Sequence, residues 1–316
     1  MNRSIGPLLL AAATLTFAGC GGRETREERA AEHAHAATAP PVQVNWTAVE
    51  KALGRSGASQ PGDVFKFGLP RGDLTVVVDR VQLKPTLALG SWVAFKPTSS
   101  GAIVMGDLVL QGDEIEPVMA KLAEGGIQVT ALHHHVLHET PRVYYMHLHG
   151  AGDPVHLAQA VGAAVGLTRT PPPAASTAVP AATPLGIDTA RIARALGHSG
   201  KINGGVYQVS VARPDTTWDE NSVIPPAMGI ATALNFQAIG AGKAAITGDF
   251  VLRAAEVNPV LGALHDHGIE VTAVHNHMLD EQPRLFFMHF WAVGDALSLA
   301  QGLRVALDKV SVKQPS

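Results

Sequence analysis

The positions of apolar residues along the chain predict a strand, a helix and then two further strands. Residues 103–110 form a mostly apolar run, which is typical of a buried strand. The next apolar set has the i, i+3, i+4, i+7 spacing of an amphipathic helix: Ile115, Val118, Met119 and Leu122. β-branched and aromatic residues then fill 127–137 and 143–149, and Glu139-Thr140-Pro141 interrupts them. We interpret these last two stretches as strands joined by a tight turn.

The same pattern returns 142 residues later. Residues 101–153 and 243–295 share 24 identities in 53 positions, so the chain contains two homologous repeats. Asp153 and Asp295 are predicted to cap the last helix of each repeat. Each repeat therefore ends in a β-α-β-β-α core, and extra strands precede it. This order favours the α+β class, in which each repeat is an antiparallel sheet with helices packed on it.

Composition divides the chain into five segments. We assign residues 1–19 to a signal peptide, 20–44 to a flexible tether, 45–168 to repeat one, 169–186 to a Pro/Ala-rich linker and 187–313 to repeat two. The chain has 316 residues, of which 46% are hydrophobic and 16% charged, as in globular proteins. A net charge of −3 gives no electrostatic footprint for nucleic acid.

The N-terminus carries a targeting signal. Arg3 precedes an apolar stretch, Ile5–Ala18, and small residues lead to Cys20, the single cysteine. This segment resembles a bacterial lipoprotein signal peptide, in which the cysteine is lipidated; the alternative is a plain secretory signal. We expect an exported protein, periplasmic or on the outer surface, whose contact with the membrane is the lipid on Cys20. The sequence identifies neither a small-molecule ligand nor an oligomeric state.

Histidines are the candidate metal ligands. If the turn centres near Thr140, His133 lies opposite His147, and His135 points to the same face as His133. Three imidazoles at these distances can converge on one ion. The second repeat retains all three of them: His275, His277 and His289. We therefore predict one three-histidine site in each repeat. The alternative is a hydrogen-bonded ladder of histidines facing a groove.

The ligand set leaves the metal open. Imidazole suits zinc, copper, iron and nickel, and zinc is our first expectation. An H-x-H pair with a third histidine on the neighbouring strand resembles the ligand layouts of α-carbonic anhydrases and cupins. Three histidines with an open position are typical of a catalytic metal site. Glu139 and Glu281, near the turns, are the candidate fourth ligands or general bases.

Further polar residues recur in both repeats. Four acidic residues are candidates to hold the N–H of a ligand histidine, or else they are turn and cap residues: Asp107, Asp249, Glu114 and Glu256. Arg142 and Arg284 follow the turn prolines. They are candidates to bind an anionic ligand, or to pair with Glu139 and Glu281 across the turn.

Three stretches of the first repeat resemble the LppY/LpqO lipoprotein family, a domain of unknown function (DUF1259): residues 104–110, 126–135 and 141–147. The second repeat matches as well, through Thr272 to His277, so the resemblance covers about residues 45–312. It implies a lipid-anchored protein in two tandem copies and brings no activity.

Three functions therefore stay open: a metal-binding protein, a metal-dependent hydrolase or lyase that uses metal-bound water, and a non-catalytic envelope module that binds a ligand. A deep pocket beside an open coordination position would favour the enzyme. A closed or shallow site would favour the metal-binding protein.

Overall fold

The computed structural model describes residues 40–172, 185–219 and 221–313, which belong to one compact unit, Pro40–Ser316. The predicted signal peptide, Cys20 and most of the tether lie outside the described residues, as does most of the predicted linker. Within the described ranges, no helix is both long enough and apolar enough to cross a membrane.

The first repeat folds into a six-stranded antiparallel sheet of order β1-β2-β5-β6-β8-β7. Its strands are β1 (Ala58–Gln60), β2 (Val64–Pro70), β5 (Gly90–Thr98), β6 (Gly101–Leu110), β7 (Gln128–His133) and β8 (Tyr144–Gly152). Its helices are α2 (Trp46–Leu53), α3 (Pro85–Ala88), α4 (Ile115–Glu124) and α5 (Pro154–Val165). A small separate hairpin is formed by β3 (Val77–Val78) and β4 (Val81–Gln82).

The second repeat has the same topology, with the order β15-β16-β14-β13-β10-β9. Its sheet contains β9 (Lys201–Asn203), β10 (Val206–Ala212), β13 (Ala231–Gly240), β14 (Lys243–Leu252), β15 (Glu270–His275) and β16 (Phe286–Asp295). Its helices are α6 (Thr189–Leu196), η1 (Pro226–Met228), α7 (Ala254–Asp266) and α8 (Ala296–Leu307), and its small hairpin is β11 (Thr217–Asp219) with β12 (Ser222–Ile224). The α+β class and the two homologous repeats are confirmed.

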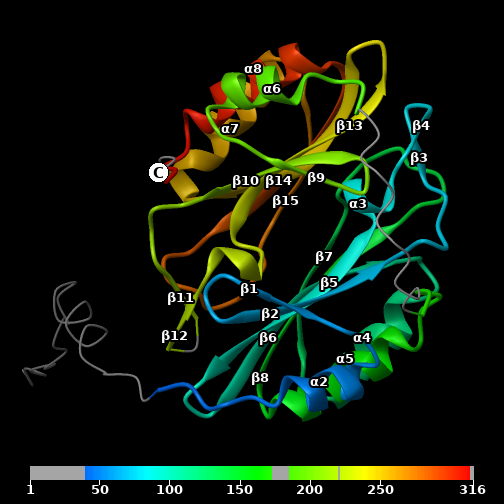
Figure 1. Cartoon of the computed structure of the whole chain (residues 1–316), viewed down its shortest axis with the longest axis vertical. Helices are drawn as coiled ribbons and strands as arrows, with labels where there is room; N and C mark the ends of the chain where they lie inside the picture. The colour runs from blue at the N-terminus through cyan, green and yellow to red at the C-terminus, as the bar shows by residue number, and fades with distance from the viewer. Residues whose placement is uncertain (1–39, 173–184, 220, 314–316) are drawn as a thin grey trace, which may run out of the picture. The chain divides into compact units, whose positions relative to one another are not determined.

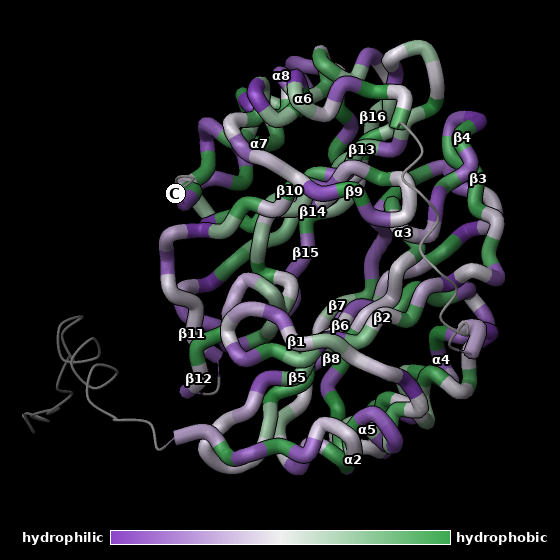
Figure 2. The backbone as a smooth tube through the Cα atoms, viewed as in Figure 1, coloured by the Kyte–Doolittle hydropathy of each residue, from purple (hydrophilic) through white to green (hydrophobic). Residues whose placement is uncertain are grey.

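The described unit has four layers, helix, sheet, sheet and helix (Figure 1). Helices α2, α4 and α5 cover the outer face of one sheet, and α6, α7 and α8 cover the outer face of the other. These helices carry both hydrophobic and hydrophilic residues (Figure 2), as amphipathic helices do when one side packs on a sheet. Asp153 and Asp295 cap α5 and α8, as predicted, because each carboxylate accepts a backbone N–H of the first turn.

The inner faces of the two sheets meet, and residues of both repeats form two shared apolar clusters there. Reciprocal hydrogen bonds join the two histidine hairpins across this interface. The Thr130 hydroxyl donates to the backbone oxygen of His277 at 2.8 Å, and the Thr272 hydroxyl donates to that of His135 at 2.7 Å. Because equivalent residues exchange these bonds, the repeats are related by a pseudo-two-fold axis that passes between the hairpins.

Candidate functional site

Each histidine hairpin has a longer loop than the sequence predicted. Strand β7 ends at His133 and β8 begins at Tyr144, so His135 lies in the connecting loop. His133 pairs with Tyr145, and His147 pairs with Ala131, so the loop centres on Glu139 rather than on Thr140. The prediction that His133 lies opposite His147 was therefore wrong. The two rings still lie on one face, with centroids 4.9 Å apart.

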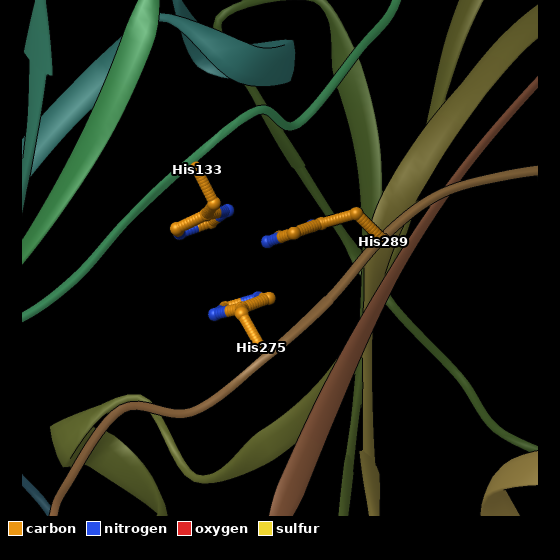
Figure 3. A group of neighbouring side chains, drawn as sticks. All are labelled: His133, His275 and His289. Atoms are coloured by element: carbon orange, nitrogen blue, oxygen red, sulfur yellow. The ribbon is translucent and has the colours of Figure 1, made fainter.

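All six predicted histidines meet at the interface between the repeats. His133 stacks on His275 with ring centroids 3.7 Å apart. The two other pairs across the interface are equally close: His135 with His289 at 3.8 Å, and His147 with His277 at 3.9 Å. Figure 3 shows the rings of His133 and His275 face to face, with His289 pointing toward the space between them. We call these six residues the histidine cluster.

The triad predicted for the first repeat, His133, His135 and His147, is one of the groups of described residues that could hold a metal ion, whereas the triad predicted for the second repeat is not among them. Three groups of three histidines have ligand atoms within 4.8 Å of one another: His133, His275 and His289; His133, His135 and His147; and His147, His275 and His277. A tetrahedral zinc ion with bonds of 2.0–2.1 Å places its nitrogens about 3.3 Å apart, so side-chain shifts of about 1 Å complete any of these groups. Two of the three groups mix residues from both repeats.

The three groups overlap pairwise. His133, His147 and His275 each belong to two groups, and every two groups have one histidine in common. One Nε2 lone pair binds one ion, so filling one group removes a ligand from each of the others. The geometry therefore favours one ion per chain.

Burial favours the neutral form of five histidines of the cluster. It lowers the pKa of His133 to about 4 and takes four others well below 6.5: His135, His147, His275 and His289. Neutral imidazole is the form that binds metals. The pKa shifts of these five histidines thus agree with a ligand role, and neutral rings do not repel one another when they pack together.

Backbone carbonyls orient two of the rings. His147 Nδ1 lies 3.3 Å from the Gly106 oxygen, and His289 Nδ1 lies 2.7 Å from the Gly248 oxygen. Since a carbonyl only accepts, Nδ1 carries the proton in both rings and Nε2 carries the lone pair. All six Nε2 atoms of the cluster are buried and make no hydrogen bond to the part of the chain that is described. Buried nitrogens of this kind call for a ligand.

Two aspartates lie against the cluster. Asp107 Oδ2 is 3.3 Å from His135 Nε2, and Asp249 Oδ2 is 3.2 Å from His277 Nε2; these are ion-pair distances without hydrogen-bond geometry. Burial raises the pKa of Asp107 to about 6. Strand pairing explains the position of both aspartates. Asp107 is the cross-strand partner of His147, and Asp249 is the cross-strand partner of His289. They are thus placed to bind the ion or to orient a histidine.

The turn glutamates have another role. Glu139 accepts the backbone N–H of Val143 at 3.3 Å, and Glu281 that of Leu285 at 2.8 Å, so each carboxylate closes its own loop. Neither belongs to a group of potential metal ligands among the described residues, and a role as fourth ligand or general base at these positions stays a prediction. Arg142 and Arg284 lie 4.0 Å and 3.3 Å from these glutamates, which is the pairing across the turn that the sequence left as one alternative.

Glu114 and Glu256 lie in a second polar arrangement that the sequence analysis missed. Arg71 donates to Glu114 at 2.7 Å and to the Val109 backbone oxygen at 2.8 Å. Arg213 binds Glu256 at 2.7 Å in the second repeat. The glutamates therefore anchor arginines rather than histidines. A signal for this existed, because Arg71-Gly-Asp and Arg213-Pro-Asp recur at the same offset of 142.

A cavity of about 430 Å³ opens beside the cluster, and four of its histidines line it: His135, His147, His277 and His289. Asp107 and Asp249 line it too, together with Lys66 and Lys201 from the front halves of the repeats. The sequence analysis missed both lysines, because the front halves have diverged and neither lysine recurs at the equivalent position. This volume lies in the usual range for small-molecule sites.

Acid is expected to destabilise the metal-free protein. The pKa of His133 falls from 6.5 to about 4 on folding, so the unfolded chain binds more protons between these values. Stability is then full above pH 6.5 and lost as the pH falls toward 4, by roughly 3 kcal/mol for His133 alone. The pKa of Asp107 rises from 3.8 to about 6 on folding, so this group makes the protein more stable in acid. Its effect is smaller than the combined effect of the five histidines, whose pKa values fall.

Urea unfolding at pH 7.5, 6 and 5 in the presence of a chelator measures this dependence. Equal or greater stability at pH 5 than at pH 7.5 would contradict the buried, neutral histidines.

Comparison with known proteins identifies a family for both repeats. The family described as Domain of Unknown Function (DUF1259) matches residues 47–166 and 190–309. No curated protein matches the chain. Among solved structures, EtuB from Clostridium kluyveri is 12% identical with a TM-score of 0.23, over 82% of this chain and 96% of that one. A trimeric bacterial microcompartment shell protein, PduB, is 14% identical with a TM-score of 0.20, over 81% and 90%.

Proposed function

Since the chain belongs to the family described as Domain of Unknown Function (DUF1259), we propose that its two repeats together bind one transition metal ion at the histidine cluster. One observation carries the proposal. Six imidazole Nε2 atoms from both repeats are buried at one place without a hydrogen bond within the described residues. A buried polar atom without a hydrogen bond costs about 1–3 kcal/mol of stability. Apolar residues at this interface would not carry that cost, so a bound ligand is the simplest reason for the six histidines.

Metal content by inductively coupled plasma mass spectrometry tests the proposal. The protein is purified without a histidine tag and offered zinc, copper, iron and nickel in parallel, with zinc expected to bind. The expected result is about one equivalent per chain. Two equivalents would instead support one site per repeat. No uptake at micromolar metal would refute metal binding and leave a ligand-binding module.

The cavity favours a second function, a metal-dependent hydrolase or lyase. A catalytic metal site needs a position open to substrate, and four cluster histidines line the cavity. A zinc ion there would lower the pKa of bound water to about 7. Asp107 also lines the cavity and takes the general-base role first considered for Glu139 and Glu281.

We predict that Asp107→Asn, assayed at a metal concentration that keeps the site filled, loses about 10²–10⁴-fold in turnover of small ester or phosphoester substrates. The exposed Asp113→Asn serves as the matched control. Turnover that Asp107→Asn leaves intact would contradict the assignment of this carboxylate as the base.

The N-terminal sequence extends the proposal to localisation. We propose that the protein is exported and held in the cell envelope by a lipid on Cys20, which is supported by the apolar stretch before this cysteine. Cys20→Ser should move the protein from the membrane fraction to the soluble fraction and abolish incorporation of labelled fatty acid. Unchanged partitioning of this variant would contradict lipid anchoring.

A further inference from the structure

We propose that the cavity beside the histidine cluster binds a small anion, a carboxylate or phosphate compound, whose acidic group is held by Lys66. If the anion is the substrate of the metal centre, this inference rests on the proposed function. The binding of the anion by Lys66 is independent of metal binding.

Lys66 is a largely buried cation, and the carboxylate of Asp107 attracts it from beyond ion-pair distance. It projects from β2 into the cavity, and its ammonium donates to the Ala227 backbone oxygen at 3.3 Å and lies 3.8 Å above the Trp92 ring. No ion pair within 4.0 Å joins Lys66 to a carboxylate of the described residues. Burial lowers its pKa to about 8, so it stays mostly protonated at neutral pH. A largely buried ammonium in this setting is stabilised by an anion.

The fold of the repeat does not require this lysine. In the first sheet, Lys66 pairs with Ala94, and Ala94 pairs with Met105. The second sheet has the equivalent row of cross-strand partners: Gln208, Asn235 and Thr247. Gln208 therefore stands at the position that matches Lys66, and it lines the same cavity, so the two walls of the cavity differ by one positive charge at this position.

The cross-strand row of the second sheet, Gln208, Asn235 and Thr247, gives the cavity a polar wall. Asn235 and Thr247 line the cavity, whereas their counterparts Ala94 and Met105 belong to an apolar cluster. Thr247 is 3% exposed, and its hydroxyl has no hydrogen-bond partner in the described chain. A buried hydroxyl that faces a cavity is a ready donor to an anion oxygen.

The two ends of the cavity differ in charge. Asp107 and Asp249 are engaged with His135 and His277 at the cluster. Lys201, at the exposed edge, adds a second positive charge that acts on Lys66. An acidic group is therefore attracted to the lysine end, and the rest of the molecule extends toward the histidines. The volume of about 430 Å³ suits a small molecule.

Isothermal titration calorimetry on the whole chain tests the proposal with three probes at constant ionic strength. Inorganic phosphate and malonate represent the two sources of the anion, and neutral malonamide is the uncharged control. We expect binding of at least one anion and none of malonamide. Lys66→Met should weaken that binding by tenfold or more, because a hydrogen bond to a charged group is lost. Thr247→Val should weaken it about two- to tenfold.

The matched control is Lys121→Met, which removes an exposed lysine from α4 and should leave binding unchanged. Near-ultraviolet circular dichroism verifies that each variant is folded. Absence of anion binding by the wild type, or equal binding by Lys66→Met, overturns the proposal.

Titrations with and without metal separate the two proposals. Anion binding that depends on Lys66 in a protein that takes up no metal would refute the metal centre alone. Metal uptake without anion binding would refute the anion site alone.

Discussion

The double variant His133→Ala/His147→Ala is expected to bind no transition metal, whereas His277→Ala/His289→Ala keeps one equivalent. The first pair breaks all three groups of histidines, because every group contains one or both of these residues. The second pair leaves the group of His133, His135 and His147 complete. Both variants lose two imidazoles, so the contrast depends on which ligands are shared rather than on how many are removed.

This contrast separates a shared centre from two independent ones. With one independent site per repeat, each double variant would keep the intact triad of the other repeat and bind one ion. With a shared centre, only the second variant binds. Removing even an outer partner of a ligand costs about 10–100-fold in affinity, so the loss of ligands should exceed that range. Zinc titration with mass spectrometry of the bound metal gives both stoichiometry and affinity.

Folding is the necessary control for these variants. Replacing buried histidines by alanine leaves space at the interface, so near-ultraviolet circular dichroism should match that of the wild type before metal is added. One equivalent bound by a folded His133→Ala/His147→Ala would contradict the shared centre.

The sequence predicted local structure well wherever the signal was local. The helical spacing beginning at Ile115 corresponds to α4, and Asp153 and Asp295 cap their helices as expected. The hairpin register was predicted incorrectly, since His133 pairs with Tyr145, two residues from the predicted partner His147. A register that differs by two residues keeps the same side chains on each face, so the alternating pattern in the sequence does not distinguish the two registers.

The sequence also did not predict that the two repeats share one histidine cluster. Two similar repeats predict two similar sites, and only the packing of the inner faces brings His133 against His275. Proximity along the chain then favoured Glu139 over Asp107, although Asp107 is the cross-strand neighbour of His147. Residues distant in sequence became neighbours through strand order, which the sequence pattern does not determine.

Arg71→Met is expected to lower the free energy of unfolding by about 3–5 kcal/mol, the usual effect of breaking a buried ion pair from one side. Arg71 is fully buried, and it binds Glu114, itself 3% exposed, and the Val109 backbone oxygen. Because Glu114 also accepts the backbone N–H groups of Gln111 and Arg169, the substitution leaves a buried carboxylate held in place, and its remaining cation is the exposed guanidinium of Arg169 at 3.6 Å.

The second repeat offers a graded comparison. Arg213→Met removes the equivalent cation, but Glu256 is 14% exposed in place of 3%, so water solvates part of the remaining charge. We therefore expect a smaller loss for Arg213→Met than for Arg71→Met. Lys121→Met serves as the surface control, because its pair with Glu124 is exposed and contributes less than about 1 kcal/mol.

Urea unfolding of the three variants measures this order. A loss for Arg71→Met that matches the loss for Lys121→Met would contradict the anchoring role of the buried arginine. If the order holds, Arg71 connects β2 to the start of α4 and to the end of β6. Strand β6 carries Asp107, and the carbonyl of Gly106 on the same strand orients His147. The buried ion pair then stabilises the strand on which the geometry of the histidine cluster depends.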